Sequence, residues 1–401
     1  MKVLVCPHQM VMGGSQLNAV EMAARVRKQG HEPLIYAPQG VLVSSVRAMG
    51  LEYVEAPEPV PGLSREWMRR LSRLVKERDI DLVHAYEWAP CIEATFSAGL
   101  RQRVPVLMSV MAMDVPEFLP RHLPLIVGTP ALAARSRSEG RQAYLLEPPV
   151  DMSHNRTTDV EAARRQWEIE PRELVVSTVT MLTTELEKLQ GVLALIAMAD
   201  RLGDRYPLRL LVAGDGEGLE QVSLRAKRVN ERHGRTVVDV LGFLADPATV
   251  YEAADVVVGM GTSAIKGLAF EKPLIVHGEG GFWQVADPES SQQFLQEGWF
   301  GANGNGAKDL EAALVKLLDH PQLRSDLGSY GRHLVKRRYS LKVASRELSG
   351  IYDEVASSHP SFSRTVSSLV RSAVGVTRFR ASMLTGNPVR QQQWSHSGVA
   401  L

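Results

Sequence analysis

The sequence predicts an α/β protein made of two doubly wound domains and a C-terminal helical tail. Short apolar runs rich in valine and leucine alternate with amphipathic stretches of helical length, which is typical of parallel βαβ units. One proline-rich segment, residues 147–151, interrupts the alternation, and a second series of strands and helices follows it. The length of 401 residues suits two such domains.

The first predicted domain comprises residues 1–150. Its apolar runs predict strands at Lys2–Cys6, Pro33–Ala37, Leu51–Glu55, Asp81–Ala85, Pro105–Val110, Leu125–Gly128 and Ala143–Leu146. Helices fill most of the intervals, notably Ser15–Gln29, Ser64–Arg78 and Ala89–Leu100. Ser15 stands where a side-chain oxygen can cap the first helix.

The second predicted domain comprises residues 151–340, with strands at Leu174–Thr180, Leu208–Ala213, Val237–Leu241, Val256–Gly259 and Leu274–His277. Helices are expected at Lys188–Gly203, Glu217–Arg232, Pro247–Ala253, Ser263–Phe270 and Leu310–Leu318, and residues 341–357 form a closing helix. Open parallel sheets bind ligands at the carboxyl ends of their strands. Two such domains in tandem therefore predict a ligand-binding crevice between them.

Composition excludes several classes of protein. Lys and Arg number 46 against 45 Asp and Glu, a net charge of +1, which argues against a nucleic-acid binder that is basic throughout. Two cysteines, Cys6 and Cys91, are too few for a disulfide framework and lack Cys-x-x-Cys spacing. Runs of 18 apolar residues and the regions of a signal peptide are also absent. We expect a reduced, cytoplasmic protein without a metal or a nucleic-acid partner.

Three glycine-containing turns follow predicted strands and suit phosphate binding. They contain Gly14 and Ser15 after the first strand, Gly214 in the segment Val212–Glu217, and Gly261, Thr262 and Ser263 before a helix that carries Lys266. Such turns offer backbone N–H groups, hydroxyls and a helix N-terminus to an anion. The strict dinucleotide fingerprint is absent from the first turn, so an ordinary tight βα turn is the alternative there.

From Met1 to about Val355 the chain resembles glycosyltransferases of family 4. The resemblance rests on "GGSQLNAVEMAARVRKQGHEPLIYAP", "LVVSTVTMLTTELEKLQG", "LVAGDGEG", "LGFLAD" and "YEAADVVVGMGTSAIKGLAFEKPLIVHGEGGFW", in that order. It implies the GT-B fold, in which two Rossmann-like domains face each other across a cleft. It also implies transfer of a sugar from a nucleotide sugar with retention and without a metal or another cofactor. The C-terminal domain of the family holds the nucleotide, and the N-terminal domain holds the acceptor.

The resemblance assigns Lys188 to the family's phosphate-binding lysine, but other anchors differ. Met181 stands where the family usually has an arginine, Lys266 replaces the glutamate that binds ribose, and Val258 replaces the first paired glutamate. We hypothesise that Lys266 reaches the donor diphosphate and restores the positive potential that its leaving group needs. The alternative is that Lys266 is a surface lysine in a degenerate site.

On the acceptor side, the sequence places His84, Tyr86 and Glu87 at the end of a strand, resembling the family's His-x-His segment. We assign His84, with Lys188 and Lys266, to catalysis, a structural histidine being the alternative. Tyr86, Glu87, Met113 and Asp114 are candidate acceptor contacts, the last two in a methionine-rich loop that alternatively only covers the sheet edge. Glu279 and Gly280 are candidate donor contacts, with a surface or capping role as the alternative for Glu279.

The tail, residues 358–401, carries five arginines and no Asp, Glu or Lys. Arg364, Arg371 and Arg378 recur every seven residues and share one helical face. The opposite face is predicted to hold Phe362, Val366, Leu369, Ala373 and Val376. We favour docking on the protein's own acidic body or partial disorder, and contact of residues 361–380 with an anionic membrane is the alternative.

Together these features predict a retaining hexosyltransferase-like enzyme that acts on a small-molecule or glycan acceptor, with a specialised metabolite such as an antibiotic or thiol among the candidates. One alternative is a non-catalytic sugar-nucleotide-binding subunit, which the changes at Met181, Val258 and Lys266 favour. A second alternative is a sugar-nucleotide epimerase of the same architecture. The base, the sugar, the acceptor and the oligomeric state, a homo-oligomer included, are left open.

Overall fold

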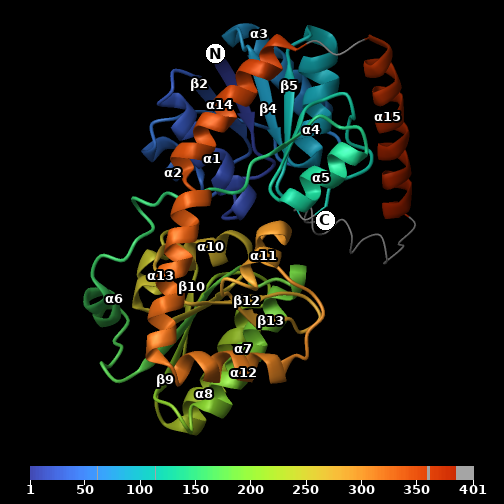
Figure 1. Ribbon diagram of the computed structural model, residues 1–401. Coiled ribbons are helices and arrows are strands. Elements are labelled where there is room, and N and C mark those ends of the chain that lie inside the picture. The colour runs from blue at the N-terminus through green and yellow to red at the C-terminus, as the bar shows by residue number, and fades with distance from the viewer. Residues whose placement is uncertain (61, 113, 359–361, 385–401) are drawn as a thin grey trace. The chain divides into compact units, whose positions relative to one another are not determined.

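The computed structural model describes residues 1–60, 62–112, 114–358 and 362–384, without the side chains of residues 362–364 and 379–384. The chain forms two compact units. Unit 1 contains Met1–Pro148 and the described residues from Leu341 onward, and unit 2 contains Pro149–Ser340 (Figure 1). Each unit is a mostly parallel sheet covered by helices, which confirms the predicted α/β class. The chain changes units at Pro148 and Ser340, and the closing helix returns to unit 1.

The sheet of unit 1 has seven strands in the order β3-β2-β1-β4-β5-β6-β7, with every neighbouring pair parallel. The strands are β1 (Lys2–Cys6), β2 (Glu32–Ala37), β3 (Glu52–Glu55), β4 (Leu82–Tyr86), β5 (Val106–Val110), β6 (Leu125–Val127) and β7 (Ala143–Leu145). The order reverses between β1 and β4, so the carboxyl ends of these two strands form the ligand-binding edge typical of doubly wound sheets.

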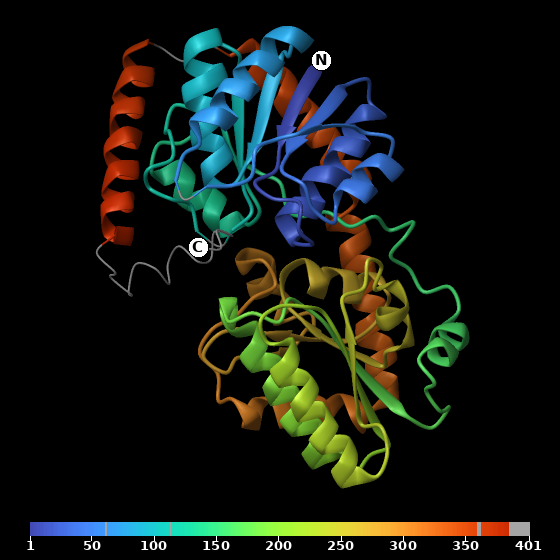
Figure 2. The same ribbon diagram turned by 180° about the vertical axis from the view of Figure 1, so that it is seen from behind.

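The helices of unit 1 cover both faces of this sheet (Figures 1 and 2). They are α1 (Gly14–Arg27), α2 (Val43–Ala48), α3 (Arg65–Arg78), α4 (Trp88–Ala94), α5 (Pro130–Ser138), α14 (Leu341–Ser357) and α15 (Phe362–Leu384). A π-helical segment, η1 (Thr95–Gln102), continues α4, where the sequence predicts one uninterrupted α-helix. Ser64 caps α3 by accepting a hydrogen bond from the Trp67 N–H at 3.1 Å.

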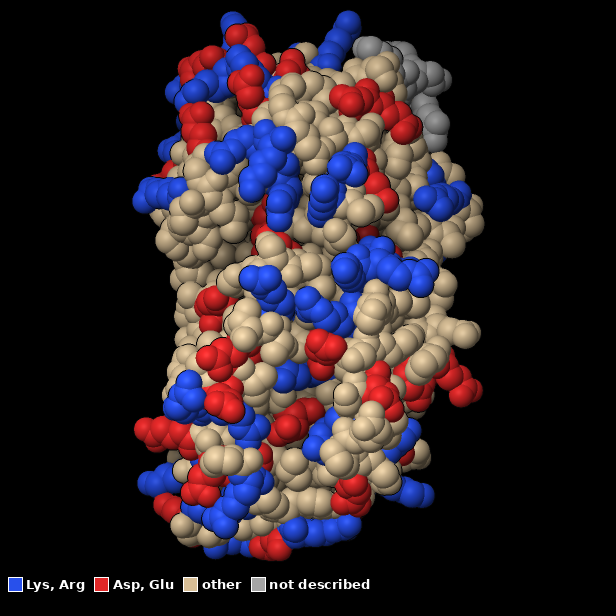
Figure 3. All heavy atoms as spheres, turned by 60° about the vertical axis from the view of Figure 1, so that its left-hand side comes forward, with Lys and Arg blue, Asp and Glu red and all other residues tan. Residues whose placement is uncertain are grey.

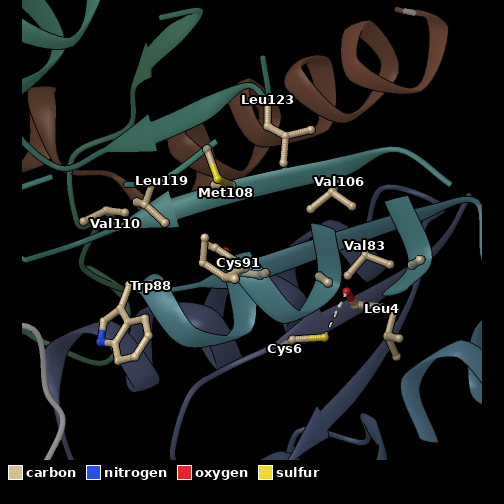
Figure 4. Close-up of a cluster of buried hydrophobic side chains, with 14 of the residues drawn as sticks. Leu4, Cys6, Val83, Trp88, Cys91, Val106, Met108, Val110, Leu119 and Leu123 are labelled. Atoms are coloured by element: carbon tan, nitrogen blue, oxygen red, sulfur yellow. Dashed lines mark hydrogen bonds between the residues drawn. The ribbon is translucent and has the colours of Figure 1, made fainter. Parts of the chain in front are cut away.

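The two faces of the unit 1 sheet bury separate apolar clusters, because successive strand side chains point to opposite sides. Leu4 and Cys6 face the cluster beneath α3 and α4, whereas Val3 and Val5 face the cluster beneath α1 and α14. Figure 4 shows the first cluster, with Cys6 and Cys91 among its buried side chains. Both thiols are free, and burial raises the pKa of each, so neither is poised to react.

The sheet of unit 2 has six strands in the order β10-β9-β8-β11-β12-β13, and β13 pairs antiparallel with β12 at the edge. The strands are β8 (Leu174–Val179), β9 (Leu208–Ala213), β10 (Val238–Gly242), β11 (Val256–Gly259), β12 (Leu274–His277) and β13 (Trp283–Val285). The helical segments are α6 (Val160–Gln166), η2 (Glu185–Glu187), α7 (Lys188–Leu202), α8 (Leu219–His233), α9 (Ala248–Ala253), α10 (Gly261–Ala269), α11 (Ser291–Glu297), α12 (Ala307–Leu318) and α13 (Pro321–Arg338).

Alternating strand residues again divide the core of unit 2. Val176 and Val258 lie in one apolar cluster, and Val175 and Val257 lie in the other. These central strands are buried on both faces and therefore read as continuous apolar runs rather than as alternating patterns. The order reverses between β8 and β11, so their carboxyl ends form the edge at which a ligand is expected.

Helix α14 returns the chain to unit 1 and closes one face of its sheet. Leu348, Ile351 and Tyr352 are buried there. The Tyr352 hydroxyl lies 2.8 Å from Nδ1 of His84 on β4, and Gln29 donates a hydrogen bond to Ser345 at 2.8 Å. The helix thus contributes both apolar burial and buried hydrogen bonds to the unit that begins the chain.

The tail helix α15 lies against unit 1 (Figure 1), and only part of the predicted apolar face, Val376, is buried there. Ser368, Ser372 and Val376 are buried, whereas Val366 and Ala373 of the predicted docking face are exposed. Phe362, Arg364 and Arg380 lie outside the described side chains, as residues 359–361 and 385–401 of the predicted tail lie outside the described residues. The docked surface includes the backbone of Arg121, whose N–H donates a hydrogen bond to Ser368.

The distribution of surface charge and the character of the described helices are those that the composition leads us to expect. Figure 3 shows Lys and Arg interspersed with Asp and Glu over the face that it presents, rather than gathered into one basic region. Across the described part of the chain, no helix combines the length and the apolar character that crossing a bilayer requires.

Candidate functional site

In unit 2, the loop that follows β8 is held in place by the glycine turn after β9. Gly214 adopts φ +153°, and a side chain there would place its Cβ 1.8 Å from the Thr180 carbonyl oxygen. The Leu182 N–H donates to the Asp215 carbonyl, and the Gly218 N–H donates to the Leu182 carbonyl, each at 2.9 Å. Close packing against this loop thus explains Gly214 without the phosphate contact that the sequence predicts.

Lys188 begins α7 directly after this loop. Leu186 and Glu187 both have positive φ, +52° and +53°, a conformation that is unfavourable for residues other than glycine. The resulting turn brings Glu185 back to the lysine, and Nζ of Lys188 lies 2.7 Å from Oε2 of Glu185. Both side chains are largely buried, at 16% and 27% exposed. The predicted phosphate-binding lysine is therefore paired with a carboxylate of its own loop.

Glu187 connects the same turn to the predicted donor contacts after β12. Its Oε2 accepts a hydrogen bond from the Gly280 N–H at 3.0 Å. Gly280 has φ +64°, and the backbone of Glu279 is fixed by the Glu279 N–H to the Gly301 carbonyl and by the Asn303 N–H to the Glu279 carbonyl, both at 3.0 Å. The Glu187 carboxylate thus already accepts the hydrogen bond of a backbone N–H group, that of Gly280, near Lys188.

The turn between β11 and α10 lies beside the same region. Helix α10 begins at Gly261, two residues earlier than predicted, so Thr262 and Ser263 lie in its first turn. The Ser263 hydroxyl donates to the Val179 carbonyl at 2.6 Å and lies 3.1 Å from the Tyr251 hydroxyl, so its place is structural. Lys266 is half-buried on the second turn of the helix.

A small hollow joins these elements at the carboxyl ends of β8, β11 and β12, with about 250 Å³ of space not filled by atoms, open solvent included. Its lining residues are Thr178, Thr180, Lys188, Gly191, Val192, Leu195, Val258, Gly259, Met260, His277 and Trp283. Met260 is also the N-cap residue of α10. Lys188 and the N-terminus of α10 therefore border one hollow, and Lys188 is the charged side chain among its described lining residues.

His277, at the end of β12, forms part of the hollow that the sequence analysis did not single out. Burial lowers the pKa of His277 to about 4, so the ring is neutral near pH 7 and adds no positive charge. The ring centroid lies 4.4 Å from that of Trp283, and a Cβ at Gly191 would approach the ring to 2.3 Å. The sequence offered one signal that could have identified His277, namely a histidine at the end of a predicted strand.

Two of the three replaced family anchors, Met181 and Val258, occupy different environments. Met181 is 39% exposed in the loop after β8, so an arginine at this position would reach solvent without burying its charge. Val258 is buried in β11 and lines the hollow. The wall that would carry a carboxylate in the family pattern is therefore apolar in this chain.

In unit 1, Ser15 and Glu87 are hydrogen-bonded to each other at the ligand-binding edge of the sheet. Helix α1 begins at Gly14 with Gly13 as its N-cap, so Ser15 does not cap the helix as predicted. Instead, the Ser15 hydroxyl donates to Oε1 of Glu87 at 2.7 Å, and the Met111 N–H donates to the same oxygen at 3.1 Å. Glu87 is buried and has φ +63° and ψ 176°, a strained backbone conformation for a residue other than glycine.

His84 and Tyr86 lie in the core, not at the edge. His84 is 0% exposed, and its ring nitrogens lie 2.8 Å from the Tyr352 hydroxyl and 2.7 Å from the Ser109 hydroxyl. Burial lowers the pKa of His84 to about 3, so the ring remains neutral. This placement disagrees with the catalytic role predicted for His84 and with the acceptor contact predicted for Tyr86, which is also buried.

The remaining acceptor candidates receive little support. Asp114 is exposed and forms an ion pair with Arg135 at 2.5 Å on the surface of unit 1. Met113 lies outside the described residues. Among the side chains that the structure describes, no three His, Cys, Asp or Glu residues come close enough to hold a metal ion.

Comparison with known proteins identifies the family. Residues 159–334 match the family "Glycosyl transferases group 1", and residues 12–130 match "Glycosyltransferase Family 4". The chain belongs to the family 4-like glycosyltransferases of the GT-B fold. The family recognised from the sequence is confirmed. The match over residues 12–130 falls in unit 1, and the match over residues 159–334 falls in unit 2, where the hollow lies.

Solved structures agree with this glycosyltransferase in fold. A glycosyltransferase from Rickettsia africae ESF-5 has a TM-score of 0.69 at 15% identity, covering 89% of this chain and 99% of that one. Anabaena HepE in complex with UDP has a TM-score of 0.69 at 14% identity, covering 88% and 100%. Sucrose-phosphate synthase from Thermosynechococcus elongatus has a TM-score of 0.67 at 14% identity, covering 88% and 99%. No protein of curated function matches the sequence.

Proposed function

We propose that this glycosyltransferase binds a nucleoside diphosphate sugar in unit 2 and transfers the sugar, with retention, to an acceptor hydroxyl or thiol. The observation that carries the proposal is the shared hollow of Lys188 and the α10 N-terminus. A primary ammonium group and the N–H groups of a helix N-terminus are both suited to a diphosphate. Anabaena HepE, similar in fold, binds UDP and UDP-glucose, which supports a nucleotide sugar as donor.

On this proposal, catalysis depends on orientation and on electrostatic stabilisation of the departing diphosphate. Lys188 supplies positive charge, and Thr262 adds a hydroxyl at the start of α10. The neutral His277 adds a polar ring beside them without further charge. No metal or other cofactor has a place in this scheme. In unit 1, the hydrogen-bonded pair of Ser15 and Glu87 is the proposed support for the acceptor, because Glu87 stands at the strand edge with a strained backbone.

Calorimetry with UDP, GDP and ADP tests donor binding, and turnover with UDP-sugars and GDP-sugars tests transfer. Lys188→Ala is expected to weaken nucleoside diphosphate binding at least tenfold, since it removes a charge-assisted hydrogen bond of about 1.5–3 kcal/mol. Lys266→Ala tests the compensation hypothesis in the same assay, with Lys336→Ala on α13 as a surface control. Unchanged nucleotide binding in Lys266→Ala would leave Lys266 outside the site, and unchanged binding in Lys188→Ala would contradict the proposal.

A second candidate is a nucleotide-sugar-binding subunit without transferase activity. It is supported by the apolar wall at Val258, where the family pattern has a carboxylate, and by the pairing of Lys188 with Glu185, which reduces the positive potential available to a leaving group. Nucleotide binding without transfer or donor hydrolysis across the sugar panel favours the subunit. Turnover of any donor favours the enzyme.

A further inference from the structure

The tail helix α15 is attached to unit 1 through its small polar residues. The Ser368 hydroxyl accepts hydrogen bonds from the Arg121 N–H at 2.7 Å and the His122 N–H at 3.2 Å. Ser372 and Val376 are buried on the same face, and a Cβ at Gly375 would lie 2.4 Å from Cβ of Phe118. Residues 368, 372, 375 and 376 follow helical spacing, so one narrow face docks on the loop between β5 and β6.

The opposite face of α15 is exposed and carries three valines. Val366, Val370 and Val374 are 43%, 59% and 45% exposed. They follow one another at intervals of four residues and form a stripe about 12 Å long. This arrangement reverses the usual one, in which a surface helix buries its apolar face and exposes its polar face. The helix therefore holds an apolar stripe away from the unit that carries it.

Positive charge borders this valine stripe. Arg371 and Arg378 are exposed, and they lie on the flank of the helix between the stripe and the docked face. The pKa of Arg141 is lowered to about 10, chiefly by burial and further by the nearby charges of Arg121 and Arg371. Glu139 lies 3.9 Å from Arg141 and offsets part of this charge. Residues 358–401 contain no acidic residue.

We propose that the outward face of α15 binds an anionic lipid surface, with the valine stripe at the level of the acyl chains and Arg371 and Arg378 at the lipid phosphates. An apolar stripe with arginines beside it is the composition of helices that lie in the membrane interface. A second copy of this chain is a poorer occupant. A symmetric contact would bring each arginine flank near its equivalent, and three valines bury far less area than a stable dimer needs.

Co-sedimentation of the full chain with vesicles tests this proposal. Vesicles of phosphatidylcholine with 30 mol% phosphatidylglycerol are compared with vesicles of phosphatidylcholine alone, at two salt concentrations. We expect binding to the anionic vesicles at least tenfold tighter than to the neutral ones, and weaker at high salt. Replacing the three valines together (Val366→Gln, Val370→Gln, Val374→Gln) should reduce binding about tenfold or more, because it removes the apolar stripe.

The matched control replaces three exposed apolar residues elsewhere, Val41, Leu224 and Val343, by glutamine. It should bind vesicles as the unmodified chain does. Circular dichroism of both triple variants checks that the fold is retained. Glutamine favours helices, so the substitutions in α15 should leave its helix intact. Arg371→Gln with Arg378→Gln should remove the preference for anionic vesicles.

Three results would overturn the proposal. They are absence of binding to anionic vesicles, equal binding by the valine variant and the unmodified chain, and a concentration-dependent dimer, seen by light scattering, that the valine variant alone abolishes. The last result would assign the stripe to a second copy of the chain. None of these measurements depends on the sugar donor, so the outcome is separate from that of the proposed function.

Discussion

At the scale of single residues, the donor site is notable for the carboxylates that its own loop supplies. Glu185 pairs with Lys188 at 2.7 Å, and Glu187 accepts from the Gly280 N–H at 3.0 Å. A diphosphate that approaches this site meets a lysine and a backbone donor that are already engaged by anions. The loop must release at least one carboxylate for the phosphate to take its place, and this release reduces the net affinity for the donor.

Glu185→Gln should therefore tighten binding of a nucleoside diphosphate, by about two- to tenfold, because an amide competes less well than a carboxylate for an ammonium group. Calorimetry with the nucleotide that the unmodified chain binds measures the change. Glu170→Gln, an exposed position away from the hollow, is the control and should leave affinity unchanged. Equal or weaker binding in Glu185→Gln would mean that the pair orients Lys188 for the donor instead of competing with it.

The sequence predicted which residues lie at this site better than it predicted the interactions that they form. Lys188, Gly280 and the α10 turn were predicted, and the structure brings them to one edge of the unit 2 sheet. The pairing with Glu185 was not predicted. It depends on the positive φ angles of two successive residues, Leu186 and Glu187, and no local sequence motif indicates this conformation. The sequence could not decide between a catalytic and a structural His84, because its contact with Tyr352 on α14 joins residues 268 positions apart.

At the scale of elements, strands were predicted closely where the sequence has short, largely apolar runs, and Leu208–Ala213, Val256–Gly259 and Leu274–His277 agree with β9, β11 and β12. The short edge strand β13, which pairs antiparallel with β12, was not predicted. Helix α13 was missed because its residues are largely polar and arginine-rich, with few buried positions. Weak periodicity leaves such elements to be defined by tertiary contacts.

The contact between α3 and α4 contains a titratable group whose effect on stability can be measured. Glu93 on α4 is buried and accepts a hydrogen bond from the Ser64 N–H at 2.5 Å. Burial raises the pKa of Glu93 to about 7, although this hydrogen bond opposes the rise. The folded state thus holds a proton more tightly than the unfolded state. The associated stability is present below about pH 4.5 and is lost as the pH rises to about 7.

Glu93→Gln should consequently stabilise unit 1 at pH 8 by up to about 3 kcal/mol, because the amide carries no charge to desolvate. At pH 4.5 the variant and the unmodified chain should be nearly equal. Urea unfolding at both pH values measures the difference. Glu66→Gln, exposed on α3, should show no comparable dependence, and a Glu93→Gln variant that is destabilised at pH 8 would contradict a buried, proton-retaining carboxyl.

At the scale of the whole molecule, the order of the chain makes the two units unequal. Unit 2 is one continuous stretch, Pro149–Ser340, whereas unit 1 is assembled from residues at both ends of the sequence. Helix α14 buries Leu341, Leu348, Ile351, Tyr352 and Val355 in the unit 1 core. At about 1.5–3 kcal/mol for each apolar side chain, their burial is comparable with the total stability of an ordinary domain.

A chain that ends at Ser340 should therefore keep unit 2 folded and lose unit 1. It lacks the apolar face of α14, and it leaves His84 buried without the Tyr352 hydroxyl. Hydrogen exchange followed by mass spectrometry should show protection retained in β8, β9 and β11 and lost in β1 and β4. A chain that ends at Ser358 keeps α14 but lacks α15, and it should protect both sheets. Protection of β1 and β4 in the shorter chain would show that residues 1–148 fold without α14, and the contribution assigned to that helix would then be too large.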